Sequence, residues 1–424
     1  MRKPFALYLT ALLALAALTG CASGPAAGAA GRSAGSSAVS GSGAASGAAS
    51  SGPETPGGTP GAASSAAASS AAASSAPEET PDPVPALLEG MTLEEKVGQL
   101  FFVRCPESGA AADAAAFHLG GILFFGRDFR DRTANEIIQA LNACQEAARA
   151  DTGIPLLLGA DEEGGTVVRI SSNPNLCAEK FRSPQQLYAD GGMEEITADA
   201  HEKDVLLRAL GLNVNFAPVC DVSTDPADFL YPRTFGQDAR GTCAYVAAVE
   251  ETMAQDGMGS VLKHFPGYGN NADTHTGSAT DTRPLETFLS SDLLPFQAGA
   301  GASDGTAAVL VCHNIVAALD GSLPASLSPA VHELLRRTLG TAAVPFGGVV
   351  MTDDLAMEAV QAYAAGGKVA VLALRAGNDM VCTTDYRTQI PAVLEAVRAG
   401  TLPESAVDGA CRRVLTWKRA LGLL

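Results

Sequence analysis

Two hydrophobic patterns alternate along the chain from about residue 92 to its end. Short, nearly continuous apolar runs are typical of strands that are buried on both faces. Longer segments between them carry apolar residues every three or four positions, as helices do when one face packs on a core. The predicted strands are Val97–Cys105, Gly121–Phe125, Pro155–Ala160, Asn213–Val219, Gly259–His264, Ala307–His313, Gly347–Thr352 and Asp379–Cys382.

The helical segments lie mostly between these runs. Thr92 and Glu95 form a capping-box pattern, which predicts a helix start. The further predicted helices are Ala134–Ala150, Thr197–Leu210, Tyr245–Asp256, Ala330–Leu339, Val360–Ala376 and a last one from Ser405 to about Leu421. Eight strand-then-helix units predict an α/β fold, a (β/α)8 barrel of the TIM type in one domain. A doubly wound open sheet is the alternative, although no Gly-x-Gly-x-x-Gly or phosphate-binding loop supports it.

The N-terminal segment follows neither pattern. Two basic residues precede an apolar run, Phe5 to Leu18, that is too short to span a membrane. Residues 1–20 therefore predict a signal peptide. The run Leu18-Thr19-Gly20-Cys21 at its end resembles the lipobox of bacterial lipoproteins. We expect Cys21 to carry lipid and to anchor the protein to the outer face of the cell membrane, outside the cytoplasm. The alternative is an ordinary signal peptide with an incidental cysteine.

Residues 21–83 predict a disordered tether. They consist almost entirely of Ala, Ser, Gly, Pro and Thr and hold no aromatic side chain. Such a segment buries too little apolar surface to offset its ordering entropy. A flexible coil of this length spans roughly 40 Å. Residues 84–424 remain, a length sufficient for one large folded domain.

Charge and cysteine content narrow the class of partner. The formal net charge is −18, nearly all of it after residue 83, which argues against binding nucleic acid or anionic lipid by charge. A soluble domain that acts on a neutral or mildly charged substrate, as a monomer, fits this balance. The nine cysteines include no C-x-x-C pair, so no metal site is indicated. Buried free thiols are favoured for the rest over one or two disulfides, which an extracellular location would allow.

Two segments combine chemistry-bearing residues with strand ends. Residues 263–275 hold a Lys-His pair, a Gly/Pro-rich loop and the pair Asp273 and His275. The run that ends at Thr352 is followed by two carboxylates, Asp353 and Asp354. A packed strand or helix has no use for such groups. Together they suggest acid/base and nucleophilic chemistry.

Further polar residues close the predicted strands. They are Asp161, Asp221, Lys263, His264, His313 and Asp353. In a (β/α)8 enzyme the site lies at the carboxyl ends of the strands, so five strands would direct polar groups into one mouth. Each residue taken alone also fits a helix cap or a structural ion pair.

Several motifs in this order resemble glycoside hydrolase family 3, from about residue 88 to the end. They lie at residues 120–125, 161–169, 215–219, 233–236, 263–267, 324–328, 350–355 and 376–380. Within the family the chain is most similar to the single-domain bacterial β-N-acetylglucosaminidases that act on peptidoglycan fragments. The sandwich domain of many family β-glucosidases has no counterpart here, which favours the hexosaminidase branch.

The resemblance implies a retaining mechanism through a covalent glycosyl-enzyme. Asp353 matches the family's nucleophile. In this branch a His on the loop after the fifth strand protonates the leaving oxygen, oriented by an Asp two residues before it, and these match His275 and Asp273. An ordinary imidazole exchanges its proton near neutral pH, so it suits both acid and base roles. The alternatives are a helix cap for Asp353 and an exposed loop residue for His275.

The resemblance also implies which side chains hold the sugar hydroxyls and the N-acetyl group. They are Asp161, Arg169, Arg233, Lys263 and His264. Carboxylates accept hydroxyl protons, while Lys and Arg donate to hydroxyl and carbonyl oxygens. The alternative for each is an inward salt bridge. Asp221 and His313 are expected to support other side chains rather than to act on substrate.

The loop departs from the family pattern at two points. Tyr268 stands where His is usual, and the stretch between Gly269 and Asp273 is one residue shorter. Because Asp273 and His275 remain, we expect catalysis to be retained, with loop reach, pH optimum and preferred aglycone open.

The predicted function is removal of terminal, non-reducing β-N-acetylglucosamine from peptidoglycan fragments or chitin-type oligosaccharides, without a metal or organic cofactor. A family phosphorylase, a β-glucosidase and a glycan-binding lipoprotein without turnover are the alternatives.

Overall fold

The computed structural model describes residues 81–275, 277–341, 343–364 and 368–424. The predicted signal peptide, Cys21 and nearly all of the predicted tether lie outside this range. Asp82–Leu424 form one compact unit. Within the described residues, no helix combines the length and apolarity that crossing a membrane requires.

Eight parallel strands form the centre of this unit, in chain order around the sheet. They are β1 (Phe101–Arg104), β2 (Gly121–Phe124), β3 (Leu157–Ala160), β6 (Val214–Asn215), β7 (Gly259–Phe265), β9 (Ala307–Val311), β11 (Val350–Thr352) and β12 (Val381–Thr383). Strand β1 pairs with β12, with Phe102 opposite Cys382, and a parallel bridge from Met351 to Met380 links β11 to the start of β12. The sheet is thus nearly closed. The predicted (β/α)8 barrel is confirmed, and the doubly wound alternative is wrong.

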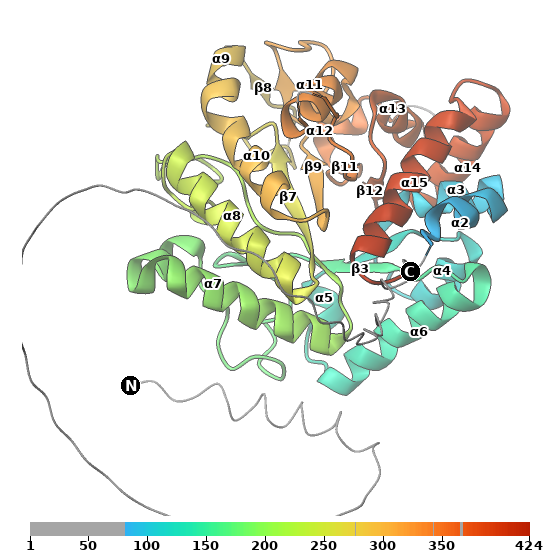
Figure 1. The fold of residues 1–424 in the computed structure, drawn as a ribbon, viewed down its shortest axis with the longest axis horizontal. Helices are drawn as coiled ribbons and strands as arrows, with labels where there is room; N and C mark the ends of the chain where they lie inside the picture. Colours follow the sequence, from blue (N-terminus) through green and yellow to red (C-terminus); the bar gives the residue numbers. More distant parts are fainter. Residues whose placement is uncertain (1–80, 276, 342, 365–367) are drawn as a thin grey trace, which may run out of the picture. The chain divides into compact units, whose positions relative to one another are not determined.

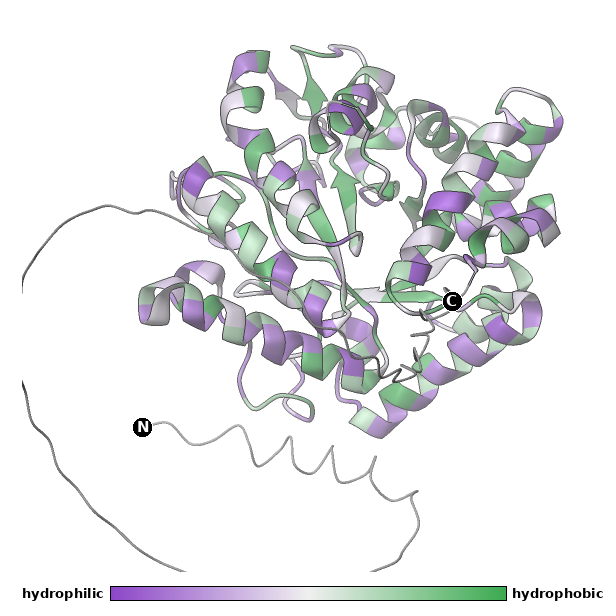
Figure 2. Cartoon of the chain, in the orientation of Figure 1, coloured by the Kyte–Doolittle hydropathy of each residue, from purple (hydrophilic) through white to green (hydrophobic). Residues whose placement is uncertain are grey.

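Helices surround the strands (Figure 1). The longer ones are α4 (Ala110–Ala116), α6 (Ala134–Thr152), α7 (Pro184–Leu210), α8 (Ala239–Asp256), α10 (Leu293–Ala302), α11 (Pro329–Leu339), α13 (Val369–Ala376) and α14 (Tyr386–Arg398). Helices α2 (Val84–Gly90) and α3 (Leu93–Gln99) precede the barrel, and α15 (Glu404–Ala420) follows it. Figure 2 shows apolar strands inside and polar helix faces outside, the pattern from which the helices were predicted.

Short elements make up the connections. They are α5 (Gly126–Phe129), α9 (Leu285–Thr287), α12 (Glu358–Gln361), the 3₁₀ turns η1 (Tyr231–Arg233) and η3 (Ala325–Leu327), and the π-helical turn η2 (Phe288–Asp292). Two small sheets lie outside the barrel: the hairpin of β4 (Glu162–Gly164) and β5 (Val167–Val168), and the pair β8 (Thr280–Asp281) and β10 (Ile315–Val316). These connections carry most of the predicted site.

A buried carboxylate fastens the barrel where it closes. Asp379, separated from β12 by Met380, is fully buried. It accepts bonds from Arg336 of α11 (2.6 Å), Arg413 of α15 (2.7 Å) and the Val350 N–H (2.9 Å). Two guanidinium partners compensate the cost of burying the charge. The contact ties the last helix to the strands, at the end of the barrel opposite the predicted site.

Candidate active site

The predicted sugar-binding residues meet in one buried network at the carboxyl ends of the strands. Lys263 of β7 places its Nζ 2.8 Å from Asp161 Oδ1 and 2.6 Å from Glu163 Oε1. Arg233 bonds the same Glu163 through Nε at 2.9 Å and Nη2 at 2.7 Å. Arg169 reaches Asp161 Oδ2 at 3.3 Å. Four predicted residues therefore lie together, joined by a carboxylate that was not predicted.

Opposite charges keep this network ionised although it is buried. The side chains of Lys263 and Glu163 are each 3% exposed. Burial alone would raise the carboxyl pKa values. Arg233 and Lys263 outweigh that effect at Glu163, and Lys263 and Arg169 do so at Asp161, so both pKa values lie below their usual range. The network thus presents fixed donors and acceptors to a ligand rather than mobile charges.

Glu163 reaches the network through a hairpin that the strand pattern did not indicate. Its neighbour Glu162 faces the other way, accepting the N–H groups of Arg169 (2.9 Å) and Ile170 (2.7 Å). These bonds fold β5 back on β4. Alternation along the short strand β4 then turns Glu163 towards Lys263. The available signal was the acidic run at 161–163, directly after a buried strand.

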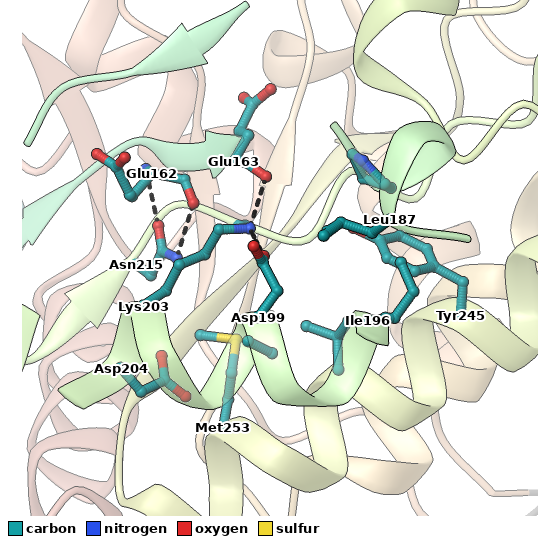
Figure 3. A pocket seen from close by; sticks show the side chains of 14 residues that line it. Glu162, Glu163, Leu187, Ile196, Asp199, Lys203, Asp204, Asn215, Tyr245 and Met253 are labelled. Carbon is teal, nitrogen blue, oxygen red and sulfur yellow. Dashed lines mark hydrogen bonds and ion pairs between the residues drawn. The ribbon is translucent and has the colours of Figure 1, made fainter. Parts of the chain in front are cut away.

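Behind Glu163, a second lysine holds the hairpin to helix α7 (Figure 3). Lys203 Nζ donates to the Glu163 carbonyl oxygen at 3.1 Å and pairs with Asp199 at 2.6 Å. The cavity bounded by these side chains and helix α8 has a volume of about 20 Å³. Such a space holds a single water molecule at most, so it cannot admit a sugar. The side chains around this cavity hold the hairpin from the helix side of the barrel.

His264 is fixed in one orientation between a carboxylate and a guanidinium. Its Nδ1 lies 2.8 Å from Asp221 Oδ2, and its Nε2 lies 3.2 Å from Arg233 Nη2. Because a guanidinium only donates, Nε2 accepts and Nδ1 carries the proton. Asp221 also accepts the His264 and Tyr268 N–H groups, and despite its burial these bonds and the histidine hold its pKa below the usual value.

Asp353 leaves the end of β11 with its backbone paired and its side chain partly exposed to the mouth. Its N–H bonds the Val311 carbonyl oxygen at 3.0 Å, and its Oδ1 accepts the Asp354 N–H at 2.8 Å. His313 lies fully buried beneath this turn and donates from Nε2 to the Asp354 carbonyl oxygen at 3.1 Å. Burial lowers the pKa of His313, while the charge of Asp353 opposes the shift. A neutral His313 therefore supports the turn that carries Asp353.

The loop after β7 brings Asp273 and His275 together. The His275 Nδ1 lies 2.7 Å from Asp273 Oδ1, which also accepts the His275 N–H at 2.9 Å. The His275 side chain is 64% exposed. With Nδ1–H donated to Asp273, Nε2 is the nitrogen left to exchange a proton with a ligand. The carbonyl oxygen of Thr274, the residue before His275, accepts the Ala359 N–H at 3.3 Å, which places this loop against the segment that follows Asp353.

Comparison with known proteins identifies the family. Residues 92–417 match the model of the glycosyl hydrolase family 3 N-terminal domain. This chain belongs to glycoside hydrolase family 3. It is 37% identical over 346 residues to the β-hexosaminidase LpqI of Mycobacterium tuberculosis, covering 79% of this chain and 84% of that protein.

Solved structures agree as well. The chain resembles a family 3 β-N-acetylglucosaminidase from Paenibacillus, with a TM-score of 0.72 and 30% identity, over 78% of this chain but only 63% of that longer one. It resembles the LpqI structure with a TM-score of 0.68 and 34% identity, over 79% of this chain and 95% of that one. The chain is therefore a glycosidase.

In this family 3 glycosidase, Tyr268 ties the base of the loop to its tip. The tyrosine is buried, and its hydroxyl lies 2.5 Å from Thr274 Oγ1 and 3.2 Å from the Thr274 N. Thr274 precedes His275 directly. The Tyr268 hydroxyl thus fixes the residue next to the predicted acid/base.

An arginine holds the same loop from below. Arg283 pairs with Asp281 of β8 (2.7 Å) and Asp292 of η2 (2.8 Å). Its guanidinium donates to the Gly267 carbonyl oxygen at 3.4 Å and lies against Gly269. Both glycines have positive φ angles, 113° and 56°. Neither Arg283 nor its partners were predicted, because their role depends on how β8 packs under the loop.

The described part of the glycosidase holds cysteines and potential metal ligands at several positions in the fold. Its eight cysteines are unpaired thiols, as the sequence favoured. Burial raises the pKa of Cys312 and Cys382 in the strand ends, which keeps them protonated. No three His, Cys, Asp or Glu side chains in this region cluster as metal ligands would.

Proposed function

We propose that this glycosidase is a retaining exo-β-N-acetylglucosaminidase. It removes terminal, non-reducing β-N-acetylglucosamine from peptidoglycan fragments or chitin-type oligosaccharides. The observation that carries the proposal is the 2.7 Å bond between Asp273 and His275, on a loop that borders the same mouth as Asp353. The β-hexosaminidase relatives and the β-N-acetylglucosaminidase structure supply the substrate class.

The buried network positions the terminal sugar. N-Acetylglucosamine is neutral and offers hydroxyl groups and one amide. Asp161 accepts hydroxyl protons, while Arg169, Lys263 and Arg233 donate to oxygens. Because these residues also hold one another, they keep their geometry before the sugar arrives, and little ordering cost falls on binding. His264 donates no proton at Nε2, so it serves by orienting Arg233.

In the first step the Asp353 carboxylate attacks the anomeric carbon, and the bond from that carbon to the leaving oxygen breaks. His275 transfers its Nε2 proton to the leaving oxygen, so the aglycone departs as a neutral alcohol. Asp273 stabilises the protonated ring through Nδ1–H. The product of this step is a glycosyl ester on Asp353.

In the second step water attacks the anomeric carbon from the face that the aglycone left. His275, now neutral, takes a proton from that water at Nε2. The ester bond breaks, the Asp353 carboxylate is restored, and the sugar leaves with its original configuration. One imidazole thus serves as acid and then as base.

The protein acts, in this proposal, at the outer face of the cell membrane. Residues 1–20 are removed as a signal peptide, Cys21 carries the lipid, and residues 22–83 carry the barrel away from the surface. Cys21→Ser expressed with its signal peptide should release the enzyme into the medium, while the parent chain stays with the membrane fraction. Equal release of both chains would refute the anchor.

The activity is tested on 4-nitrophenyl β-N-acetylglucosaminide and the matching β-glucoside, each with and without phosphate. We expect hydrolysis of the N-acetyl substrate without phosphate, loss with Asp353→Asn and a severe decrease with His275→Ala. Release of sugar 1-phosphate only when phosphate is present would make the enzyme a phosphorylase. A preference for the glucoside would make it a β-glucosidase.

A further inference from the structure

One cation at the mouth of the barrel takes no part in the sugar network. Arg104 is the last residue of β1, opposite Leu123 of β2, at the same end of the barrel as Asp161 and Asp353. The Arg104 Cζ lies 4.2 Å from the centroid of the Phe125 ring. The Arg169 Cζ lies 5.3 Å from the same ring. Phe125 thus joins Arg104 to the edge of the network that holds the terminal sugar.

Arg104 differs from the other cations of the mouth in its lack of partners. Lys263, Arg233 and Arg169 each bond a carboxylate of the network. Within the described ranges, the Arg104 guanidinium makes no hydrogen bond or ion pair to protein, and its Nε is shielded from solvent. The two terminal Nη groups also lack a hydrogen bond to the described residues but are not shielded in this way, so they are available to a ligand.

Two carboxylates influence Arg104 without bonding it. Asp128 accepts the Phe125 N–H at 2.7 Å, and Asp354 accepts the Ala356 N–H at 2.9 Å. Burial raises the pKa of both carboxyl groups, and the charge of Arg104 opposes that rise from a longer distance. Around the barrel, β1 lies between β11, which leads into Asp353, and β3, which leads into Asp161, so Arg104 stands between the predicted nucleophile and the sugar network.

The chemistry of the proposed substrate distinguishes the part of the site that binds the terminal sugar from the part that binds the leaving sugar. The terminal N-acetylglucosamine is neutral, and the paired network already supplies its donors. A free, planar and permanently charged donor matches a carboxylate, which a guanidinium binds through two parallel hydrogen bonds. A carboxylate in the substrate must then belong to the leaving half.

We propose that Arg104 binds a carboxylate on the aglycone and selects leaving sugars that carry one. This inference rests on the proposed hydrolysis of β-N-acetylglucosaminides and narrows its substrate class. Peptidoglycan fragments, in which the leaving amino sugar carries an acidic ether substituent, fit such a site. Chitin-type oligosaccharides, whose leaving sugar is neutral, do not use it.

The test compares three disaccharides with the same terminal sugar. They are N-acetylglucosaminyl-β-1,4-N-acetylmuramic acid, its methyl ester, and N,N′-diacetylchitobiose. For the parent enzyme we expect kcat/KM to be highest on the free acid. Arg104→Met should lower kcat/KM on the acid about tenfold, mainly through KM, and change it by less than about twofold on the ester and on chitobiose.

Arg169→Met is the matched control, because Arg169 contacts the same ring but also bonds Asp161. It should lower kcat/KM on all three substrates. Equal losses on all three with Arg104→Met, together with a lowered Tm, would show a structural role and overturn the proposal. So would a parent enzyme that does not distinguish acid from ester, or phosphate-dependent turnover that Arg104→Met abolishes. Absence of any sugar release by the parent enzyme would instead refute the proposed function itself.

Discussion

A single buried lysine organises the sugar-binding half of the site. Lys263 bonds both Asp161 and Glu163, and Glu163 in turn holds Arg233. Buried ion pairs add little net stability when complete, because desolvation offsets their attraction. Removal of one partner is costly, since it leaves an uncompensated charge. The network is therefore better understood as a device for fixed geometry than as a source of stability.

Glu163→Gln should destabilise the enzyme and weaken substrate binding. Lys263 and Arg233 would lose a shared counter-charge, which we expect to lower the free energy of unfolding by about 3 kcal/mol at pH 7 and to raise KM. Urea denaturation and steady-state kinetics check this. The exposed Glu179→Gln is the control.

The difference in stability between the parent enzyme and Glu163→Gln should also depend on pH. The folded-state pKa of Glu163 is depressed, so its ionised form stabilises the fold above the unfolded pKa, and that contribution is lost as pH falls through the acid range. The stability gap between the parent and Glu163→Gln should therefore stay nearly constant from pH 7 to about 5 and narrow as pH falls further, towards about 3. A gap that widens on acidification would contradict the assignment.

Tyr268→Phe should slow the step in which His275 acts. The change deletes the hydroxyl that bonds Thr274 and leaves the buried ring in place. Loss of one hydrogen bond, worth ~1 kcal/mol, should lower kcat about fivefold with KM nearly unchanged. The decrease should be larger on a disaccharide than on a nitrophenyl glycoside, whose leaving group needs little protonation.

Tyr188→Phe, at an exposed tyrosine, is the control for that comparison. If Tyr268→Phe slows both substrates equally, Tyr268 does not act through His275.

Single residues differed in how far the sequence revealed them. Asp161, Lys263 and Asp353 stand at strand ends inside recognisable motifs, so their placement could be predicted. Glu163 could not be placed, because its direction depends on a hairpin too short to leave a periodic signal. Arg104 gave no signal at all, since its isolation depends on what β2 and β12 bring beside it.

The loop between β7 and β8 is the element on which the proposed acid/base depends. Two sets of side-chain contacts hold this loop in place. Arg283 supports Gly267 and Gly269 from below, and Tyr268 bonds the threonine next to His275. These contacts fix the backbone up to Thr274, while the side chain of His275 that follows stays exposed to a ligand.

Gly269→Ala should damage the loop while leaving the barrel intact. Gly269 has φ +56°, and a Cβ there would collide with the Arg283 guanidinium. We expect kcat to fall about tenfold or more, with a Tm near that of the parent, because the strain of a few kcal/mol stays in the loop. Gly277→Ala is the matched control, since a Cβ there meets nothing within 4 Å. Equal activity of the two variants would refute the supporting role of Arg283.

At this scale the sequence predicted which elements exist better than where they begin. The first strand starts at Phe101, not Val97, because residues 97–99 complete helix α3. The capping box at Thr92 is confirmed. Residues 360–376 contain the end of α12 and all of α13 rather than one helix. Apolar periodicity continues through such breaks, so it cannot locate them.

At the scale of the whole molecule, a buried acid links helix α8 to the barrel. Glu250 is fully buried, accepts the Ser260 hydroxyl at 2.7 Å through Oε2, and leaves Oε1 without a partner among the described residues. Asp204 of α7 is nearby. Burial is the main cause that raises the pKa of Glu250 to about 8. The contact between helix α8 and the barrel therefore favours the protonated form of the Glu250 carboxyl group.

Stability should fall as pH rises through neutrality. A raised folded-state pKa means that the contribution of Glu250 is complete below the unfolded pKa and is lost as pH rises towards 8. The isosteric Glu250→Gln keeps an acceptor for Ser260 and cannot ionise, so its Tm should decline less than that of the parent between pH 5 and 8. The exposed Glu251→Gln should behave like the parent. Parallel declines for all three would show that Glu250 is already ionised at pH 5.

The global architecture was the most predictable level. Eight apolar runs spaced by helices leave few alternatives to a barrel, and chain order around the sheet follows from short right-handed connections. Closure was not predictable in detail. It depends on Asp379, which the apolar pattern placed only as the first residue of a strand.

The central claim is that Asp353 forms a covalent bond to the sugar. It is tested by reaction with a slow 5-fluoro-N-acetylglucosaminyl fluoride, followed by peptide mapping with mass spectrometry. We expect one sugar per chain, attached at Asp353, and no label in Asp353→Asn. Label on Asp161 or Asp354, or substrate turnover without any labelled peptide, would contradict it.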